Sequence, residues 1–108
     1  MVHMKEAYGC DMRGMLSFHI LWLLSKRPMH GEAIAEEIGK KRGEKPKAGT
    51  IYPALKQLKE KNMIRGTKEG KAVVYSLTNE GKRTVKFATE YFCRSFNDIY
   101  EEHRKGTK

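Results

Sequence analysis

Apolar residues recur at helical spacing along residues 12–26, the longest apolar stretch of the chain. Leu16, Ile20 and Leu23 fall on one side of the expected helix, with Leu24 beside them. A helix that is apolar on more than one side must be covered on more than one side. We therefore expect a second subunit or a long neighbouring helix against its other side, which carries Met12, Met15, Phe18 or His19, and Trp22.

A second helix is predicted from the segment MHGEAIAEEIGKKRG, residues 29–43. Ile34 and Ile38 fall on one side of it, and acidic residues occupy the other. Its acidic residues come early and its basic residues late, as the helix dipole favours. Gly39 or Gly43 can end this helix, since glycine adopts the left-handed conformation common at helix C-termini.

A third helix is predicted over residues 50–61, with Thr50 as its N-cap. Pro53 then falls in the first turn, where backbone N–H groups have no partner within the helix, so it forfeits no hydrogen bond. The residues expected to face the core are Ile51, Leu55 and Leu58.

The spacing changes to alternation in residues 63–77, which predicts a two-stranded hairpin with a basic tip of Arg65, Lys68 and Lys71. Thr78 is then the N-cap of a last helix from Asn79 to about Arg104. Such a helix would be about 35–40 Å long at ~1.5 Å per residue. That is longer than the small preceding unit can cover alone.

These elements predict a mainly α fold with a small β-hairpin. The second and third helices form a helix-turn-helix, and the hairpin after them is the wing. We expect a winged-helix DNA-binding domain over residues 12–78 and a C-terminal dimerisation helix over residues 79–105.

Positive charge is concentrated in the middle of the chain. Residues 40–71 hold eleven Lys and Arg against three Glu, a net charge of +8, whereas the remaining residues balance to +1. Such a block attracts polyanions. Because it coincides with the helix-turn-helix and the wing, we expect these elements to bind DNA.

A recognition helix presents its N-terminal residues to base edges in the major groove. Lys56 is the best candidate to reach a guanine edge, and Gln57 is the second choice. Tyr52 could donate to a phosphate or lie against a thymine methyl group. Gly49 lets the backbone approach phosphate. The predicted DNA-binding residues are Lys47, Gly49, Thr50, Tyr52, Lys56, Gln57, Lys59, Arg65, Lys68 and Lys71.

Three segments resemble the signature segments of the PadR family of winged-helix transcriptional regulators: ILWLLSKRPMHGEAIAEEI, GTIYPALKQLKEKNMI and VYSLTNEGK. Two positions depart from the family pattern. Glu32 stands where the family usually has tyrosine, and Asn62-Met63 replaces the usual Gly-Leu. Asparagine tolerates left-handed backbone angles, so the turn after the third helix is expected to survive.

The resemblance implies a homodimer that binds double-stranded operator DNA, usually as a repressor, with a single C-terminal helix as in the short subclass of the family. It also implies that the first and last helices form the dimer. The predicted interface residues are Met15, Phe18, Trp22, Val85, Phe92, Phe96 and Ile99.

Other interpretations are open at this stage. The basic face could bind RNA or an acidic protein. Some PadR-like proteins recognise flat hydrophobic compounds at the dimer centre, so the aromatic residues could line an effector cavity. The simpler interpretation of these residues is an aromatic dimer core.

Several classes of function lack a sequence signal. No nucleophile–base set indicates an enzyme, and no spacing of His, Cys or acidic residues indicates a metal or cofactor site. Cys10 and Cys93 are far apart and form no redox motif. With no apolar run of ~18 residues and no signal peptide, we expect a cytoplasmic protein.

Overall fold

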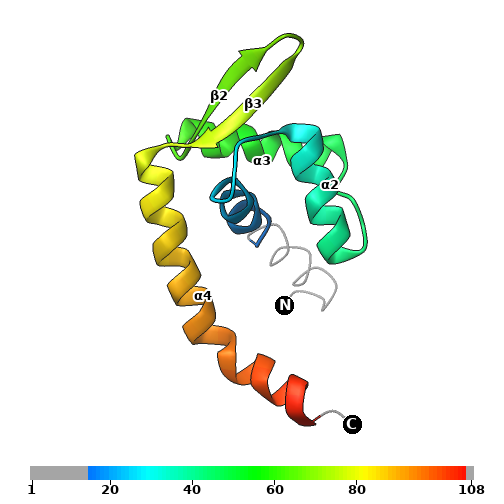
Figure 1. Cartoon of the computed structure of the whole chain (residues 1–108), viewed down its shortest axis with the longest axis vertical. Coiled ribbons are helices and arrows are strands. Elements are labelled where there is room, and N and C mark those ends of the chain that lie inside the picture. The colour runs from blue at the N-terminus through cyan, green and yellow to red at the C-terminus, as the bar shows by residue number, and fades with distance from the viewer. Residues whose placement is uncertain (1–14, 107–108) are drawn as a thin grey trace, which may run out of the picture.

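The computed structural model describes residues 15–106, which form four helices and a small three-stranded antiparallel sheet (Figure 1). The prediction of a mainly helical fold with a small sheet is confirmed. The predicted domain start at residue 12, Met12 and Cys10 lie outside the described residues. The first helix includes residues 15–24, and the other elements are β1 (Met29–His30), α2 (Gly31–Arg42), α3 (Ala48–Glu60), β2 (Ile64–Glu69), β3 (Ala72–Leu77) and α4 (Asn79–Gly106).

The first helix and α2 contribute their apolar sides to one core, in which Leu16, Ile20 and Ile38 are all buried. Of the two glycines offered by the sequence, Gly43 ends α2. Its φ is 85°, and its N–H donates to the carbonyl of Gly39 at 2.8 Å. Gly39 remains inside the helix, so the left-handed cap decides where α2 ends.

The helix α3 begins earlier than predicted, and Thr50 is not its N-cap. The N-cap is Lys47, whose carbonyl accepts hydrogen bonds from the N–H groups of Thr50 and Ile51, both at 2.9 Å. No side chain caps this end. The preference of threonine for the N-cap is worth only about 1 kcal/mol, so it does not fix a helix start against the rest of the fold.

The predicted place of Pro53 is also wrong. Pro53 lies inside α3, as the sixth residue of a helix that begins at Ala48. From there it removes one hydrogen bond, the bond that would be donated to the carbonyl of Gly49. Gly49 is exposed, so water can reach its carbonyl, and the helix continues to Glu60.

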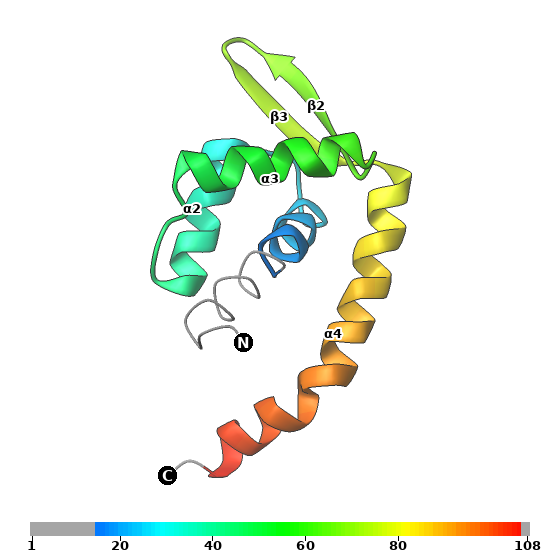
Figure 2. The same cartoon turned by 180° about the vertical axis from the view of Figure 1, so that it is seen from behind.

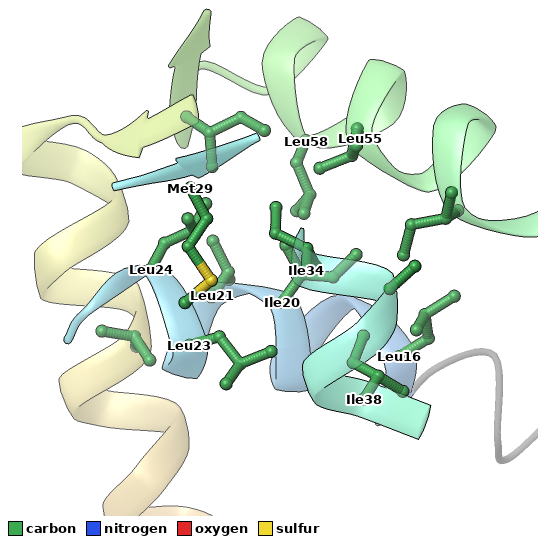
Figure 3. Packing of buried hydrophobic residues seen from close by; sticks show 14 residues of the cluster. Leu16, Ile20, Leu21, Leu23, Leu24, Met29, Ile34, Ile38, Leu55 and Leu58 are labelled. Atoms are coloured by element: carbon green, nitrogen blue, oxygen red, sulfur yellow. The ribbon is translucent and has the colours of Figure 1, made fainter. Parts of the chain in front are cut away.

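The side of α3 that faces the core is the side predicted from the sequence. Ile51, Leu55 and Leu58 are 1–4% exposed. Figure 3 shows Leu55 and Leu58 directed from α3 into the core that also holds Ile20. The core therefore anchors one side of α3 along its whole length.

The sheet has one more strand than the predicted hairpin. Its order is β1-β3-β2, with all pairs antiparallel. The two-residue β1 pairs with the wing, placing Met29 opposite Tyr75 and His30 opposite Val74. Gly70 begins the tight turn between β2 and β3 with a φ of 63°. The wing is thus tied directly to the start of α2.

Four residues form a junction where α3 ends, the wing closes and α4 begins: Asn62, Met63, Thr78 and Gly81. Thr78 is the predicted N-cap of α4, because its Oγ1 accepts from the N–H of Gly81 at 3.0 Å. The same Oγ1 donates to the carbonyl of Asn62 at 2.7 Å, and the Thr78 N–H donates to the carbonyl of Met63 at 3.0 Å. Asn62 has the expected positive φ, 63°.

Beyond its first turns, α4 leaves the compact body (Figure 1). It has 28 residues and continues past the predicted end to Gly106. Val85 in its second turn is 6% exposed and belongs to the core of the same chain. Val85 is therefore a residue of the chain's own core, and its predicted role at a dimer interface is corrected.

We expect Thr78→Ala to lower the free energy of unfolding by about 1–2 kcal/mol, because it removes the N-cap and the bond to Asn62. Thr78→Ser keeps both hydrogen bonds and should keep most of the stability. Chemical denaturation at one fixed protein concentration measures both. Equal losses in the two variants would show that the methyl group, and not the hydroxyl, matters.

Candidate nucleic-acid interface

The side of α3 that faces away from the core is uncovered and cationic. Lys56 and Lys59 are exposed, as is Gln57. Figure 2 shows α3 lying across the surface of the body, with the wing rising beside it. This side of α3 is therefore free to approach a partner.

The predicted residues do not all point the same way around α3. At about 100° per residue, Lys56 lies roughly 130° around the helix from the buried stripe, on one edge of the outward-facing side. Thr50 and Gln57 lie on a flank, where both border a cavity of about 570 Å³ that Ser17 of the first helix also lines. Tyr52 lies on the other flank, toward α2. Lys56 and Gln57 thus lie on either side of the outward direction, and both are exposed.

The start of α3 combines three features that suit an anion. The first N–H groups of a helix have no intrahelical partner, and the helix dipole makes this end positive. Gly49 is exposed and has nothing within 4 Å of the place where a Cβ would stand. Lys47 is exposed immediately before the helix. A phosphate could therefore approach this backbone closely.

Tyr52 is 45% exposed, although its ring contacts α2 at Gly31. It also influences Tyr75 of β3. The pKa of Tyr75 is raised, mainly by partial burial and in addition by the nearby Tyr52. Tyr52 therefore lies between α2 and the wing, an arrangement that the sequence pattern did not indicate.

The wing carries its basic residues in two places. Lys68 and Lys71 lie close to the turn, where Lys68 is paired with Val73. Arg65 is paired with Ser76 near the base, so its predicted place at the tip is wrong. All three side chains are exposed.

Glu32, the departure from the family pattern in α2, forms an ion pair with Lys45. A hydrogen bond from Lys45 to Glu32 raises the pKa of Lys45. The pair joins the start of α2 to the loop that leads into α3. The pairing of Lys45 with Glu32 was not predicted from the sequence, because the two residues are 13 positions apart.

All ten predicted DNA-binding residues are exposed. They lie on the start of α3, its outer side and the wing. A model of the PadR-like family of transcriptional regulators matches residues 20–86, more than half of the chain. The chain belongs to the PadR-like family. It is therefore a DNA-binding transcriptional regulator, the class expected from the sequence.

Solved structures support this assignment. RosR from H. salinarum is 29% identical, with a TM-score of 0.69 over 75% of this chain and 74% of that one. A transcriptional regulator from Clostridium thermocellum is 25% identical, with a TM-score of 0.73 over 84% and 95%. A PadR family transcription regulator from Clostridium difficile is 28% identical, with a TM-score of 0.65 over 79% and 97%. No curated protein matches this chain.

The PadR-like chain has a second feature, an apolar groove between the first helix and α4. The rings of Phe18 and Phe92 are stacked with centroids 5.5 Å apart, and those of Phe92 and Phe96 are 5.0 Å apart. Two cavities of about 440 and 410 Å³ border this ladder, and both are lined by Met15, Phe92 and Cys93. The second cavity also contacts Trp22.

Within residues 15–106, no group of three or more His, Cys, Asp or Glu could hold a metal ion. None of the helices in this part of the chain is long and apolar enough to span a membrane.

His19 borders the groove beside Trp22 and Arg42. Burial lowers the pKa of His19 below its ordinary value of 6.5, and the positive charges of Arg42 and Lys41 lower it further. The unfolded chain therefore takes up this proton at a higher pH than the folded chain does. By linkage, stability contributed through His19 falls as the pH drops through 6.5 and below.

We expect His19→Gln to flatten the dependence of unfolding free energy on pH between about 7.5 and 5.5, because this variant removes the titrating group. Denaturation curves at several pH values measure the slope. His30→Gln, at an exposed position before α2, is the matched control and should keep the slope of the native chain. An unchanged slope in His19→Gln would contradict the expectation.

Proposed function

We propose that this chain represses transcription as a cytoplasmic homodimer that places α3 in the major groove of a double-stranded operator. The observation that carries the proposal is the division of α3 into two sides. Ile51, Leu55 and Leu58 are buried, whereas Lys56 and Lys59 on other sides are exposed. The major groove of B-DNA is about 12 Å wide and accepts an α-helix.

The contacts proposed for this interface fall into two kinds. Lys56, on the outward-facing side, reads a base edge, and Gln57 is a second reader from the other edge of that side. Lys47 and the backbone at Gly49 bind phosphate at the start of α3. Lys68 and Lys71 bind the backbone or minor groove beside the site. The remaining proposed contacts are Thr50, Tyr52, Lys59 and Arg65.

The proposed homodimer rests on the uncovered apolar side chains of α4. Phe96 is 43% exposed and Ile99 is 63% exposed. Both line the groove beside the first helix, together with Met15. A second copy of the chain, related by a two-fold axis, would cover these residues. Two copies of α3 would then meet half-sites about one helical turn, roughly 34 Å, apart.

Repression follows from occupancy, since a dimer on a promoter blocks other proteins from the same DNA. The groove supports a second, compatible role. A flat hydrophobic effector bound beside Phe18, Trp22 and Phe92 would lie between the first helix and α4. It would change DNA affinity only if it bound the free and DNA-bound forms differently.

Binding of RNA or of a protein is the alternative use of the same basic surface. The major groove of duplex RNA is deep and too narrow for side chains to read, so the exposed side of α3 fits B-DNA better. Comparison of duplex DNA, duplex RNA and single strands at one salt concentration separates these functions. Tighter binding of an RNA would overturn the proposal.

We expect Lys56→Ala to weaken binding of the operator by about 1–3 kcal/mol and to relax specificity at one base pair. Lys68→Ala and Lys71→Ala should instead weaken binding of all duplexes about equally and reduce the dependence on salt. Gel-shift titrations against a duplex selected from genomic fragments, and against a scrambled duplex, measure both effects.

The ratio of the two affinities decides the role of Lys56. A fall in the ratio means that Lys56 reads sequence. Equal losses on the selected and the scrambled duplex would instead make Lys56 a phosphate contact.

We expect the double variant Phe96→Asp, Ile99→Asp to sediment as a monomer, because two charges in an apolar interface cannot be paired or hydrated. Phe92→Asp should also disrupt the dimer, but Phe92 stacks on Phe18 of its own chain, so that variant perturbs the protomer as well. Analytical ultracentrifugation measures the oligomeric state.

Phe87→Asp is the matched control for this experiment. Phe87 is 72% exposed and lies nine residues before Phe96, about two and a half helical turns, so it faces the opposite way. The control should remain a dimer. A stable, folded dimer from the double variant would place the interface elsewhere.

A further inference from the structure

Gly31, the first residue of α2, is buried under the ring of Tyr52. Its φ is not positive, so the main chain does not require glycine at this position. A Cβ here would lie 2.7 Å from Cε1, 2.8 Å from Oη and 2.9 Å from Cζ of Tyr52. The missing side chain is therefore what leaves room for the outer end of the ring.

The ring of Tyr52 lies against α2 at Gly31 and near the wing at Tyr75. Gly31 directly follows β1, in which His30 pairs with Val74 of the wing. Partly buried Tyr75 of the same wing strand lies close enough to interact electrostatically with Tyr52. Tyr52 nevertheless remains 45% exposed, so part of its ring is accessible from outside.

We propose that Gly31 is a positioning residue for DNA recognition, which holds the Tyr52 ring between α2 and the wing before DNA arrives. The inference rests on the proposed function, in which Tyr52 contacts the duplex. A side chain that is already held loses little rotamer freedom on binding. This freedom is worth roughly two- to tenfold in affinity for one side chain.

Gly31→Ala separates the position of Tyr52 from the fold. The atoms that a new Cβ would meet belong to the free end of a tyrosine side chain, which can turn away. Alanine is also a better helix former than glycine, so α2 itself is not weakened. We therefore expect the variant to fold with the Tyr52 ring displaced.

The first measurement uses the full chain without DNA. In the native chain, the Hα protons of Gly31 should show nuclear Overhauser effects to the Tyr52 ring and an upfield ring-current shift. Tyr52→Ala should abolish both signals. Their absence from a folded native chain would overturn the inference while leaving the proposed function intact.

The second measurement is a double-mutant cycle on DNA affinity with a selected duplex. We expect Gly31→Ala to weaken binding roughly two- to tenfold. Adding Gly31→Ala to Tyr52→Ala should cause no further loss, because the residue acts only through Tyr52. Gly106→Ala is the matched control, since nothing lies within 4 Å of its added Cβ.

Each outcome of the cycle decides a different point. Losses that multiply, or unchanged affinity in Gly31→Ala, would overturn the inference alone. A native chain that binds no duplex would overturn the proposed function and the inference with it. If Gly31→Ala fails to fold, the double variant Gly31→Ala, Tyr52→Ala decides whether the contact with the Tyr52 ring is the cause. Refolding in the absence of the Tyr52 ring supports the contact, and continued misfolding overturns it.

Discussion

The placement of α4 beside α3 and the wing depends on the junction of Asn62, Met63, Thr78 and Gly81. Thr78 joins the carbonyls of Asn62 and Met63 to the first turn of α4, so one residue closes the wing and starts the last helix. The approach is so close that a Cβ on Gly81 would lie 2.0 Å from the Met63 carbonyl oxygen. Backbone atoms cannot yield as a flexible side chain can, so only glycine lets the start of α4 lie this close to the chain that follows α3.

The same junction separates two surfaces of the molecule, the cationic side of α3 and the apolar side chains far along α4. Only one side of α3 packs into the core. Of α4, only the first turns pack into it, and Val85 is buried there. The outer side of α3 is left cationic, and the far part of α4 is left with exposed apolar side chains such as Phe96 and Ile99. Glu32 modifies the cationic surface, because it pairs with Lys45 near the start of α3. That pairing offsets one positive charge in the loop without touching the outward position of Lys56.

The sequence predicted those parts of the fold that depend on spacing or on one local rule. Buried stripes such as Ile51, Leu55 and Leu58 follow from helical periodicity, and the cap at Thr78 follows from hydrogen bonding by a hydroxyl. The start of α3 was missed because its N-cap, Lys47, makes no side-chain capping bond, so no capping residue marks this start in the sequence. The two-residue β1 is too short to have a period. The contact of Tyr52 with Gly31 joins residues that are distant along the chain, and no local pattern encodes it.

In the proposed dimer, the closely packed start of α4 has a consequence for recognition. If the far parts of two α4 helices form the interface, their crossing angle would reach α3 through the hydrogen bonds of the junction. A change in that angle would then alter the separation of the two recognition helices, and half-sites at a fixed spacing would no longer be met together. The groove beside Phe18 and Phe92 lies where α4 leaves the body, between its fixed start and its uncovered end. An effector there would act at a point from which a small displacement could reach both copies of α3.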